Sequence, residues 1–129
     1  MLEAGYQSKI IKEINSIGGH AINGTYSKSG EADLQCGIPI IIDEIYGGRR
    51  RGKKILIHCA IEVKTEKDYD RVMRAVDSDY NIVDSKPLKK HEPLQMAKIR
   101  LLRKKGGLAI VAYNFKQVMD YVTGEMNGK

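Results

Sequence analysis

Long hydrophobic runs are missing from this chain of 129 residues. A membrane-spanning helix needs about 20 consecutive apolar residues, and the longest apolar stretch here falls far short of that length. The opening residues, MLEAGYQSK, also lack the charged start and long apolar stretch of a secretory signal. We therefore expect no membrane span, no secretory leader and a cytoplasmic location.

Cysteine is scarce as well, because Cys36 and Cys59 are the only two. They form no CxxC pair, and their spacing matches no zinc-binding pattern. We expect two buried, reduced thiols rather than a disulfide. The three histidines, His20, His58 and His91, show no ligand spacing to one another, and we expect His58 to be a partly buried strand residue.

Acidic residues are outnumbered: 22 Lys and Arg stand against 16 Asp and Glu, which gives a net charge of +6. A basic excess favours an anionic partner, of which nucleic acid is a common one. A basic protein that is simply well solvated is the alternative, and charge alone leaves both open. With 42% hydrophobic residues and no repeat, the chain reads as one globular domain spanning residues 1–129.

The first half predicts one helix and three strands. Tyr6, Ile10, Ile14 and Ile17 recur at helical spacing, so residues 2–17 should form an amphipathic helix that ends at a Gly-Gly pair. The strands are expected at residues 20–24, at 32–36 with a continuation or a new strand after a kink at Pro39, and at 54–64. The last is apolar on both faces and should be central and buried, and a Gly-rich basic connection precedes it.

The second half predicts helix, strand and helix. Residues 66–92 form a long insertion with one short helix near 70–76. Pro93 suits the first turn of the next helix. The apolar face of that helix is expected to comprise Leu94, Ala97, Leu101 and Leu102. A strand at 108–113 and a final helix capped by Asn114 complete the order αβββαβα, an α/β fold with a small mixed sheet flanked by helices.

Candidate chemistry lies at the end of the strand over residues 54–64, in the motif IEVKT. Glu62 and Lys64 are two residues apart and so leave the same face, while Val63 points to the other. A carboxylate at a strand end is a good oxygen ligand for Mg²⁺. The alternative is an ordinary solvated ion pair.

Asp33, in the motif SGEADL, strengthens the first interpretation. If its strand pairs with the one that ends at Glu62, the two carboxylates lie side by side and can hold a divalent cation, which lowers the pKa of a bound water. Lys64 could then steady the attacking water or the charge that develops on phosphorus. Taken alone, Asp33 also suits an ordinary turn.

Several polar side chains are candidates for contact with nucleic-acid phosphates. The expected contacts are Ser27, Lys28, Ser29, Arg49, Arg50, Arg51 and Lys98. A solvated hairpin end is an equal alternative for the three arginines, and a solvent-facing helix side is the alternative for Lys98.

On these motifs the chain resembles the virus-type replication-repair nuclease (VRR-NUC) domain of the PD-(D/E)XK nuclease superfamily. LEAGYQSKIIKEINSIGG is similar to the family's opening helix, SGEADL stands in place of its Gly-x-Pro-Asp motif, IEVKT matches its Glu-Val-Lys, and PLQMAKIRLLRKKGGLAIV matches its later helix and strand. Ala32 replaces the usual Pro, and the insertion at residues 66–92 is longer than the family's usual loop.

The resemblance implies a restriction-endonuclease-like core and a role for each motif residue. Asp33 and Glu62, with the Val63 carbonyl, would bind Mg²⁺ or Mn²⁺, and Lys64 would be the catalytic lysine. Gln95 would orient water or phosphate, and Glu3 would be an auxiliary carboxylate. Without the resemblance, Gln95 reads as an ordinary helix residue and Glu3 as a charge that favours the helix dipole.

The activity implied is metal-dependent endonucleolytic hydrolysis of phosphodiester bonds in branched DNA, such as Holliday junctions, during replication, repair or recombination. A homodimer would match the two-fold symmetry of a junction. The resemblance also implies a bacterial host cytoplasm and a phage-encoded origin. The alternatives are a non-catalytic nucleic-acid-binding module on the same fold and a nuclease that acts on flaps or linear duplex.

Overall fold

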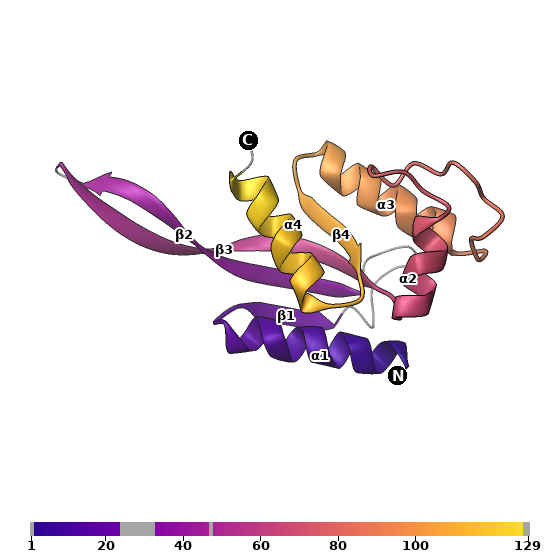
Figure 1. Cartoon of the computed structure of the whole chain (residues 1–129). Helices are drawn as coiled ribbons and strands as arrows, with labels where there is room; N and C mark the ends of the chain where they lie inside the picture. Colours follow the sequence, from indigo (N-terminus) through magenta and orange to yellow (C-terminus); the bar gives the residue numbers. More distant parts are fainter. Residues whose placement is uncertain (1, 24–32, 47, 128–129) are drawn as a thin grey trace.

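The structure is a computed structural model that describes residues 2–23, 33–46 and 48–127, apart from the side chains of 42–46, 49–51 and 127. Along the chain, one helix is followed by three strands, two helices, a last strand and a last helix (Figure 1). They are α1 (Glu3–Ser16), β1 (His20–Asn23), β2 (Leu34–Tyr46), β3 (Arg49–Val63), α2 (Glu66–Met73), α3 (Glu92–Lys104), β4 (Leu108–Ala112) and α4 (Phe115–Asn127). Among the described residues, no helix is both long and apolar enough to cross a membrane.

The four strands form one mixed sheet in the order β1-β2-β3-β4. β1, β2 and β3 pair antiparallel, whereas β3 and β4 pair parallel. A parallel pair needs a long crossover, which α2 and α3 supply. The predicted mixed sheet flanked by helices is therefore confirmed, and the short helix expected within the insertion is α2, which makes the full order αβββααβα.

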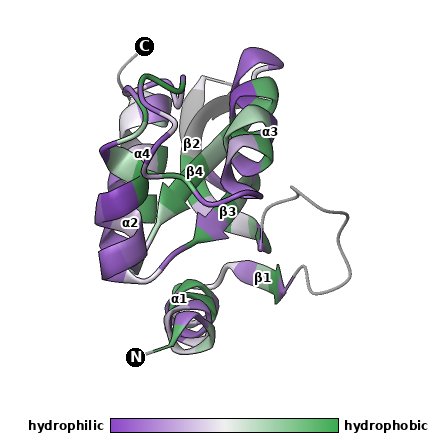
Figure 2. Cartoon of the chain, turned by 90° about the vertical axis from the view of Figure 1, so that its right-hand side faces the viewer, coloured by the Kyte–Doolittle hydropathy of each residue, from purple (hydrophilic) through white to green (hydrophobic). Residues whose placement is uncertain are grey.

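Helices cover the two faces of the sheet with separate cores. On one face, α1 and α4 pack against alternate strand residues. This core includes Ile10, Ile14, Leu34, Cys36, Ile38, Cys59, Ile61, Val63, Val118 and Val122. On the other face, α2, α3 and the segment between them pack on Ala60, Ala109 and Val111. Figure 2 shows this layering from the end of the sheet, with β4 mainly hydrophobic and hydrophilic outer sides on α1 and α2.

The β2–β3 hairpin is much longer than the rest of the sheet. β2 runs through Pro39 without a break, because its pairing with β1 extends only as far as Gly37, and no other described strand lies on that side beyond it. The hairpin projects as a two-stranded arm (residues 41–54) past the helices (Figure 1). The predicted hairpin is confirmed, but its second strand begins at Arg49 and not at residue 54, so most of the Gly-rich basic stretch belongs to β3.

Burial along β3 is also uneven, contrary to the prediction of a strand buried throughout. Residues from Cys59 to Val63 are buried, and this is the stretch that pairs with β4. Leu56 is 53% exposed, and His58 is exposed, with a ring nitrogen 2.7 Å from Gln35 Oε1. Neither β4 nor the second core extends over that part of the strand.

Two helices differ from their predicted form. α2 begins earlier than expected because the Thr65 hydroxyl caps it, accepting the Asp68 N–H at 3.1 Å. The buried face of α3 carries Glu92, Met96 and Ile99, whereas Leu94 and Leu101, two of the residues predicted to face inward, are each 45% exposed. The true inner face starts with a charged residue, which a hydrophobic pattern cannot reveal.

Candidate active site

Asp33 and Glu62 meet at the end of the sheet opposite the arm. The β2–β3 register pairs Leu34 with Ile61, so Asp33 enters β2 beside the last residues of β3. The Val63 N–H donates to Asp33 Oδ2 at 2.9 Å. The predicted hairpin partnership of these two motifs is thereby confirmed.

Glu62 is only 1% exposed and lies on the face of the sheet that carries α2 and α3. Burial, a hydrogen bond with the Asp33 side chain and the Asp33 charge raise the pKa of Glu62 to about 10. Within the described part of the chain, its Oε1 atom is buried without a hydrogen-bond partner. Two close carboxylates in a buried setting cannot both ionise readily unless a cation joins them.

Lys64 is the residue immediately after β3, and its N–H extends the parallel ladder to the Ala112 carbonyl at 3.0 Å. The side chain is buried on the same side as Glu62. Its Nζ donates to Gln95 Oε1 at 3.0 Å and to Glu92 Oε2 at 3.1 Å. The structure therefore brings Gln95, at the start of α3, to the candidate lysine, while the role in orienting water or phosphate that the resemblance implies stays a prediction.

Glu92 belongs to the same cluster and was not foreseen. Its carboxylate accepts two hydrogen bonds from Arg71, at 2.6 and 2.8 Å, and one from the Lys89 N–H at 2.7 Å. Burial alone would raise the pKa of Glu92, but the bonds from Arg71, Lys89 and Lys64 outweigh it and lower the pKa to about 2. An acidic residue in a first helical turn ordinarily suggests a favourable interaction with the helix dipole, so no pattern in the sequence indicates this role.

Glu3 approaches the cluster from the first turn of α1. Loss of hydration raises the pKa of its carboxyl, the nearby Asp33 charge raises it further, and Lys64 opposes both. These interactions place Glu3 within electrostatic reach of the site. A role in binding a cation through water remains a prediction.

The donor set suits a hard divalent cation. Mg²⁺ is held in proteins by one or two carboxylates together with waters and substrate phosphates. Asp33 and Glu62 supply two carboxylates, and Glu62 Oε1, which has no hydrogen-bond partner among the described residues, is available as a metal ligand. Among the described residues there is no group of three His, Cys, Asp or Glu side chains that could hold an ion. The Val63 backbone contacts Asp33 through its N–H, so metal ligation by the Val63 carbonyl stays a prediction.

The expected nucleic-acid contacts are dispersed. Ser27, Lys28 and Ser29 lie outside the described residues. Arg49, Arg50 and Arg51 begin β3 near the tip of the arm, and Arg50 lies twelve residues before Glu62. At about 3.3 Å per residue this is roughly 40 Å along the strand.

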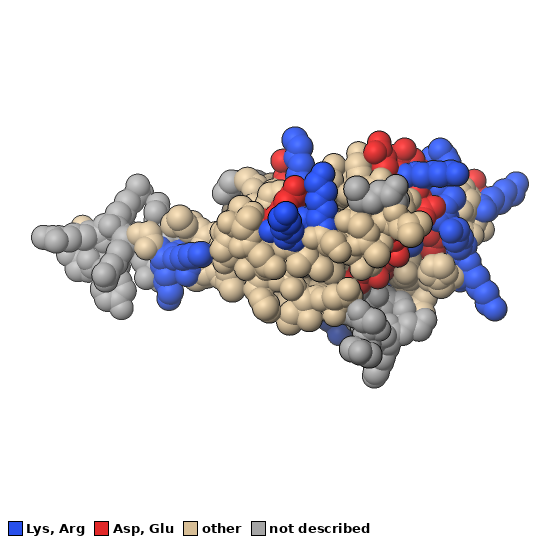
Figure 3. Space-filling model, turned by 90° about the horizontal axis from the view of Figure 1, so that it is seen from below, with Lys and Arg blue, Asp and Glu red and all other residues tan. Residues whose placement is uncertain are grey.

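Lys98 lies one helical turn after Gln95 on α3, which puts the two on the same side of the helix. On the face seen in Figure 3, the described basic side chains are interspersed with acidic ones at the end opposite the arm. The positive charge on this face is therefore spread out and forms no single patch.

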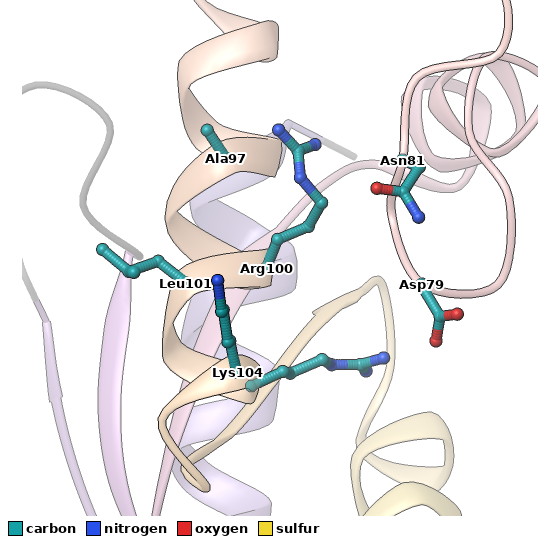
Figure 4. Close-up of a pocket in the computed structure, with 7 residues that line it drawn as sticks. Asp79, Asn81, Ala97, Arg100, Leu101 and Lys104 are labelled. Carbon is teal, nitrogen blue, oxygen red and sulfur yellow. The ribbon is translucent and has the colours of Figure 1, made fainter.

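A separate cavity of about 570 Å³ lies between α3 and the segment that follows α2 (Figure 4). Its lining residues are Asp79, Asn81, Ala97, Arg100, Leu101, Arg103 and Lys104. Arg100 donates to the Tyr80 carbonyl at 2.6 Å, while Arg103 donates to the Ala109 carbonyl at 2.7 Å and stacks on the Tyr80 and Tyr121 rings. Because both guanidinium groups hold this segment against α3 and β4, we place the candidate chemistry at Asp33 and Glu62 instead.

Comparison of the chain with protein-family models, with curated proteins and with solved structures found no match.

Proposed function

We propose that this protein is a divalent-metal-dependent DNA endonuclease of the PD-(D/E)XK type, similar to the VRR-NUC domain. The observation that carries the proposal is the convergence of Asp33, Glu62, Lys64 and Gln95, with one buried Glu62 oxygen that has no partner among the described residues. These are the residues that the motif resemblance singled out. Asp33 lies just before β2, Glu62 and Lys64 lie at the end of β3, and Gln95 lies in α3, so sequence proximity does not explain how these three segments meet.

Asp33 and Glu62 are the residues that would hold the cation, Mg²⁺ or Mn²⁺. When bound, such an ion neutralises phosphate charge and lowers the pKa of a coordinated water. In the reaction, a water oxygen forms a bond to phosphorus, and the bond between phosphorus and one sugar oxygen breaks. The leaving sugar oxygen takes up a proton that comes from the water. Lys64 contributes a fixed positive charge near the phosphate, and Gln95 orients that ammonium group.

The substrate we favour is branched DNA, cut by a homodimer. The chain folds around one sheet and offers no additional DNA-reading domain among the described residues, which favours recognition of shape over sequence. A four-way junction has two-fold symmetry, and two identical active sites match it. The basic residues of the arm supply phosphate contacts at a distance from the cut.

The test is a cleavage assay on a labelled four-way junction, a matched linear duplex and a flap, each with Mg²⁺, Mn²⁺ or EDTA. Glu62→Ala removes a proposed metal ligand, and Asp120→Asn, in an exposed ion pair on α4, is a charge-matched control. Paired symmetric nicks on the junction alone, lost with EDTA and in Glu62→Ala, are the expected result.

Each other outcome changes the proposal in a defined way. Cleavage of flaps or of every substrate keeps the nuclease and removes the junction preference. Tight binding without cleavage under any metal condition would replace the nuclease with a non-catalytic nucleic-acid-binding module. Equal cleavage by wild type and Glu62→Ala would show that the site lies elsewhere.

A further inference from the structure

We propose that residues 66–92 complete the active site, because Arg71 forms an ion pair with the buried Glu92 carboxylate, which positions the Lys64 ammonium group. This inference rests on the proposed nuclease function. It gives the long segment between β3 and α3 a role at the site itself. Arg71 and Glu92 are positioning residues, since they act on the reaction through Lys64.

The geometry links three parts of the chain through one carboxylate. Glu92 Oε2 accepts from Lys64 Nζ at 3.1 Å and from Arg71 Nη2 at 2.8 Å, while its Oε1 accepts from Arg71 Nη1 at 2.6 Å. Arg71 Nη1 also donates to the Pro87 carbonyl at 2.8 Å. The crossover segment is therefore fastened to the lysine through α2 and the start of α3.

Local structure aims Arg71 at this point. The chain leaves β3 at Lys64, and the Thr65 cap starts α2 directly afterwards. Asp68 lies in the first turn of α2, and its Oδ1 atom is 3.4 Å from Arg71 Nη2, so it holds a second side of the guanidinium group. The short connection leaves little freedom between the lysine and the helix that carries Arg71.

A lysine amine needs such support because it ends a flexible four-carbon stem. Gln95 and Glu92 together accept two of the three ammonium hydrogens. Counting contacts with the described residues, the third hydrogen is left for a substrate oxygen. Glu92 also balances the charge of a lysine that is only 4% exposed.

Stability alone explains this cluster poorly. Taking charges out of water is costly, and buried ion pairs can often be replaced by apolar side chains without loss of stability. Glu92 is 1% exposed, and Arg71 binds it in the two-pronged geometry that fixes orientation best. A fixed orientation matters most where a side chain must meet a reacting group.

The experiment compares Glu92→Gln and Arg71→Met with wild type in single-turnover cleavage. A misplacement of about 1 Å at a catalytic group can cost about 10²-fold in rate, so we expect kcat of Glu92→Gln to fall by about that factor with little change in KM. The double variant should be no slower than Glu92→Gln, because Arg71 acts through Glu92. Asp120→Asn should keep the wild-type rate.

A second readout does not depend on cleavage. In ¹⁵N NMR spectra, the held Lys64 ammonium group should give a slowly exchanging signal, assigned by its absence in Lys64→Arg. We expect Glu92→Gln to lose or broaden that signal while circular dichroism shows a folded protein. If Glu92→Gln fails to fold, Arg71→Met provides the same comparison.

Unchanged kcat in a folded Glu92→Gln protein, or an unchanged Lys64 signal, would overturn the inference and leave the nuclease proposal intact. Additive losses in the double variant would also overturn it. If wild type cuts no substrate, the nuclease proposal fails, and the NMR comparison still decides whether Glu92 holds Lys64.

Discussion

Replacing Glu62 with Gln should stabilise the metal-free protein while abolishing the proposed DNA cleavage. Glu62 is buried, and its pKa is raised above the ordinary value of 4.5 to about 10 by burial and by Asp33. At neutral pH its carboxyl is therefore protonated in the folded chain and ionised in the unfolded chain. The Gln amide keeps the shape of the protonated acid and can donate to Asp33 in the same way.

The sign of the pH dependence follows from that difference. Because the folded pKa is the higher one, the stability that Glu62 contributes is complete below pH 4.5 and is lost as pH rises towards the folded pKa. A difference of one bound proton between the folded and unfolded states changes the free energy of unfolding by at most about 1.4 kcal/mol per pH unit. For a chain of this size, about 1 kcal/mol moves Tm by roughly 4 °C, so the variant should gain up to about 10 °C over wild type between pH 6 and pH 8.

The assay is thermal unfolding in EDTA, followed by circular dichroism at intervals across that range. Using the difference between the two proteins removes the contributions of groups that titrate alike in both. Added Mg²⁺ should then raise Tm of wild type and leave Glu62→Gln unchanged, since a ligand stabilises only the state that binds it. Parallel pH curves for the two proteins, or an equal response to Mg²⁺, would refute the reasoning.

Three further predictions concern other parts of the molecule. The pKa of Glu92 is lowered to about 2, so its stabilising effect is present above pH 4.5 and is lost as pH falls towards 2. The free energies of unfolding of wild type and Glu92→Gln, measured in urea, should therefore converge in acid. Gln95→Ala removes one acceptor of Lys64 and should slow single-turnover cleavage by about tenfold, well beyond any change in DNA affinity measured by anisotropy. Replacing residues 43–52 of the arm with an Asn-Gly turn should leave Tm nearly unchanged. The slope of log DNA affinity against log salt concentration should become shallower by an amount equivalent to up to about three phosphate contacts. An unchanged slope would show that the arm does not contact the DNA.

The hairpin that joins Asp33 to Glu62 could be predicted because its signals are local. Alternating apolar residues mark β3, and a Gly-rich turn between two apolar segments favours antiparallel pairing. In an antiparallel pair, the start of one strand must lie beside the end of the other. The inner face of α1 followed from helical spacing in the same way, as the burial of Ile10 and Ile14 shows.

The length of the arm and the inner face of α3 could not be predicted, because each depends on what lies opposite in space. Exposed and buried parts of β3 have the same alternating pattern, and only the short partner β4 separates them. In α3, the residue that begins the buried face is Glu92, which a hydrophobicity pattern assigns to solvent. Its burial is possible because Arg71, which lies 21 positions earlier, neutralises it.

The candidate Lys64 could be identified from its motif, whereas the residues that support it could not. Glu62 and Lys64 lie two residues apart at the end of one strand, so a short motif contains both. The residues that hold them need only reach the same point, so they can come from any neighbouring element. Here Glu92 on α3 accepts a hydrogen bond from the Lys64 ammonium group, and Arg71 on α2 holds Glu92 through a bidentate contact that requires both helices to be in place. A substitution that shifts α2 should therefore disturb the lysine even though no residue of α2 belongs to the motif.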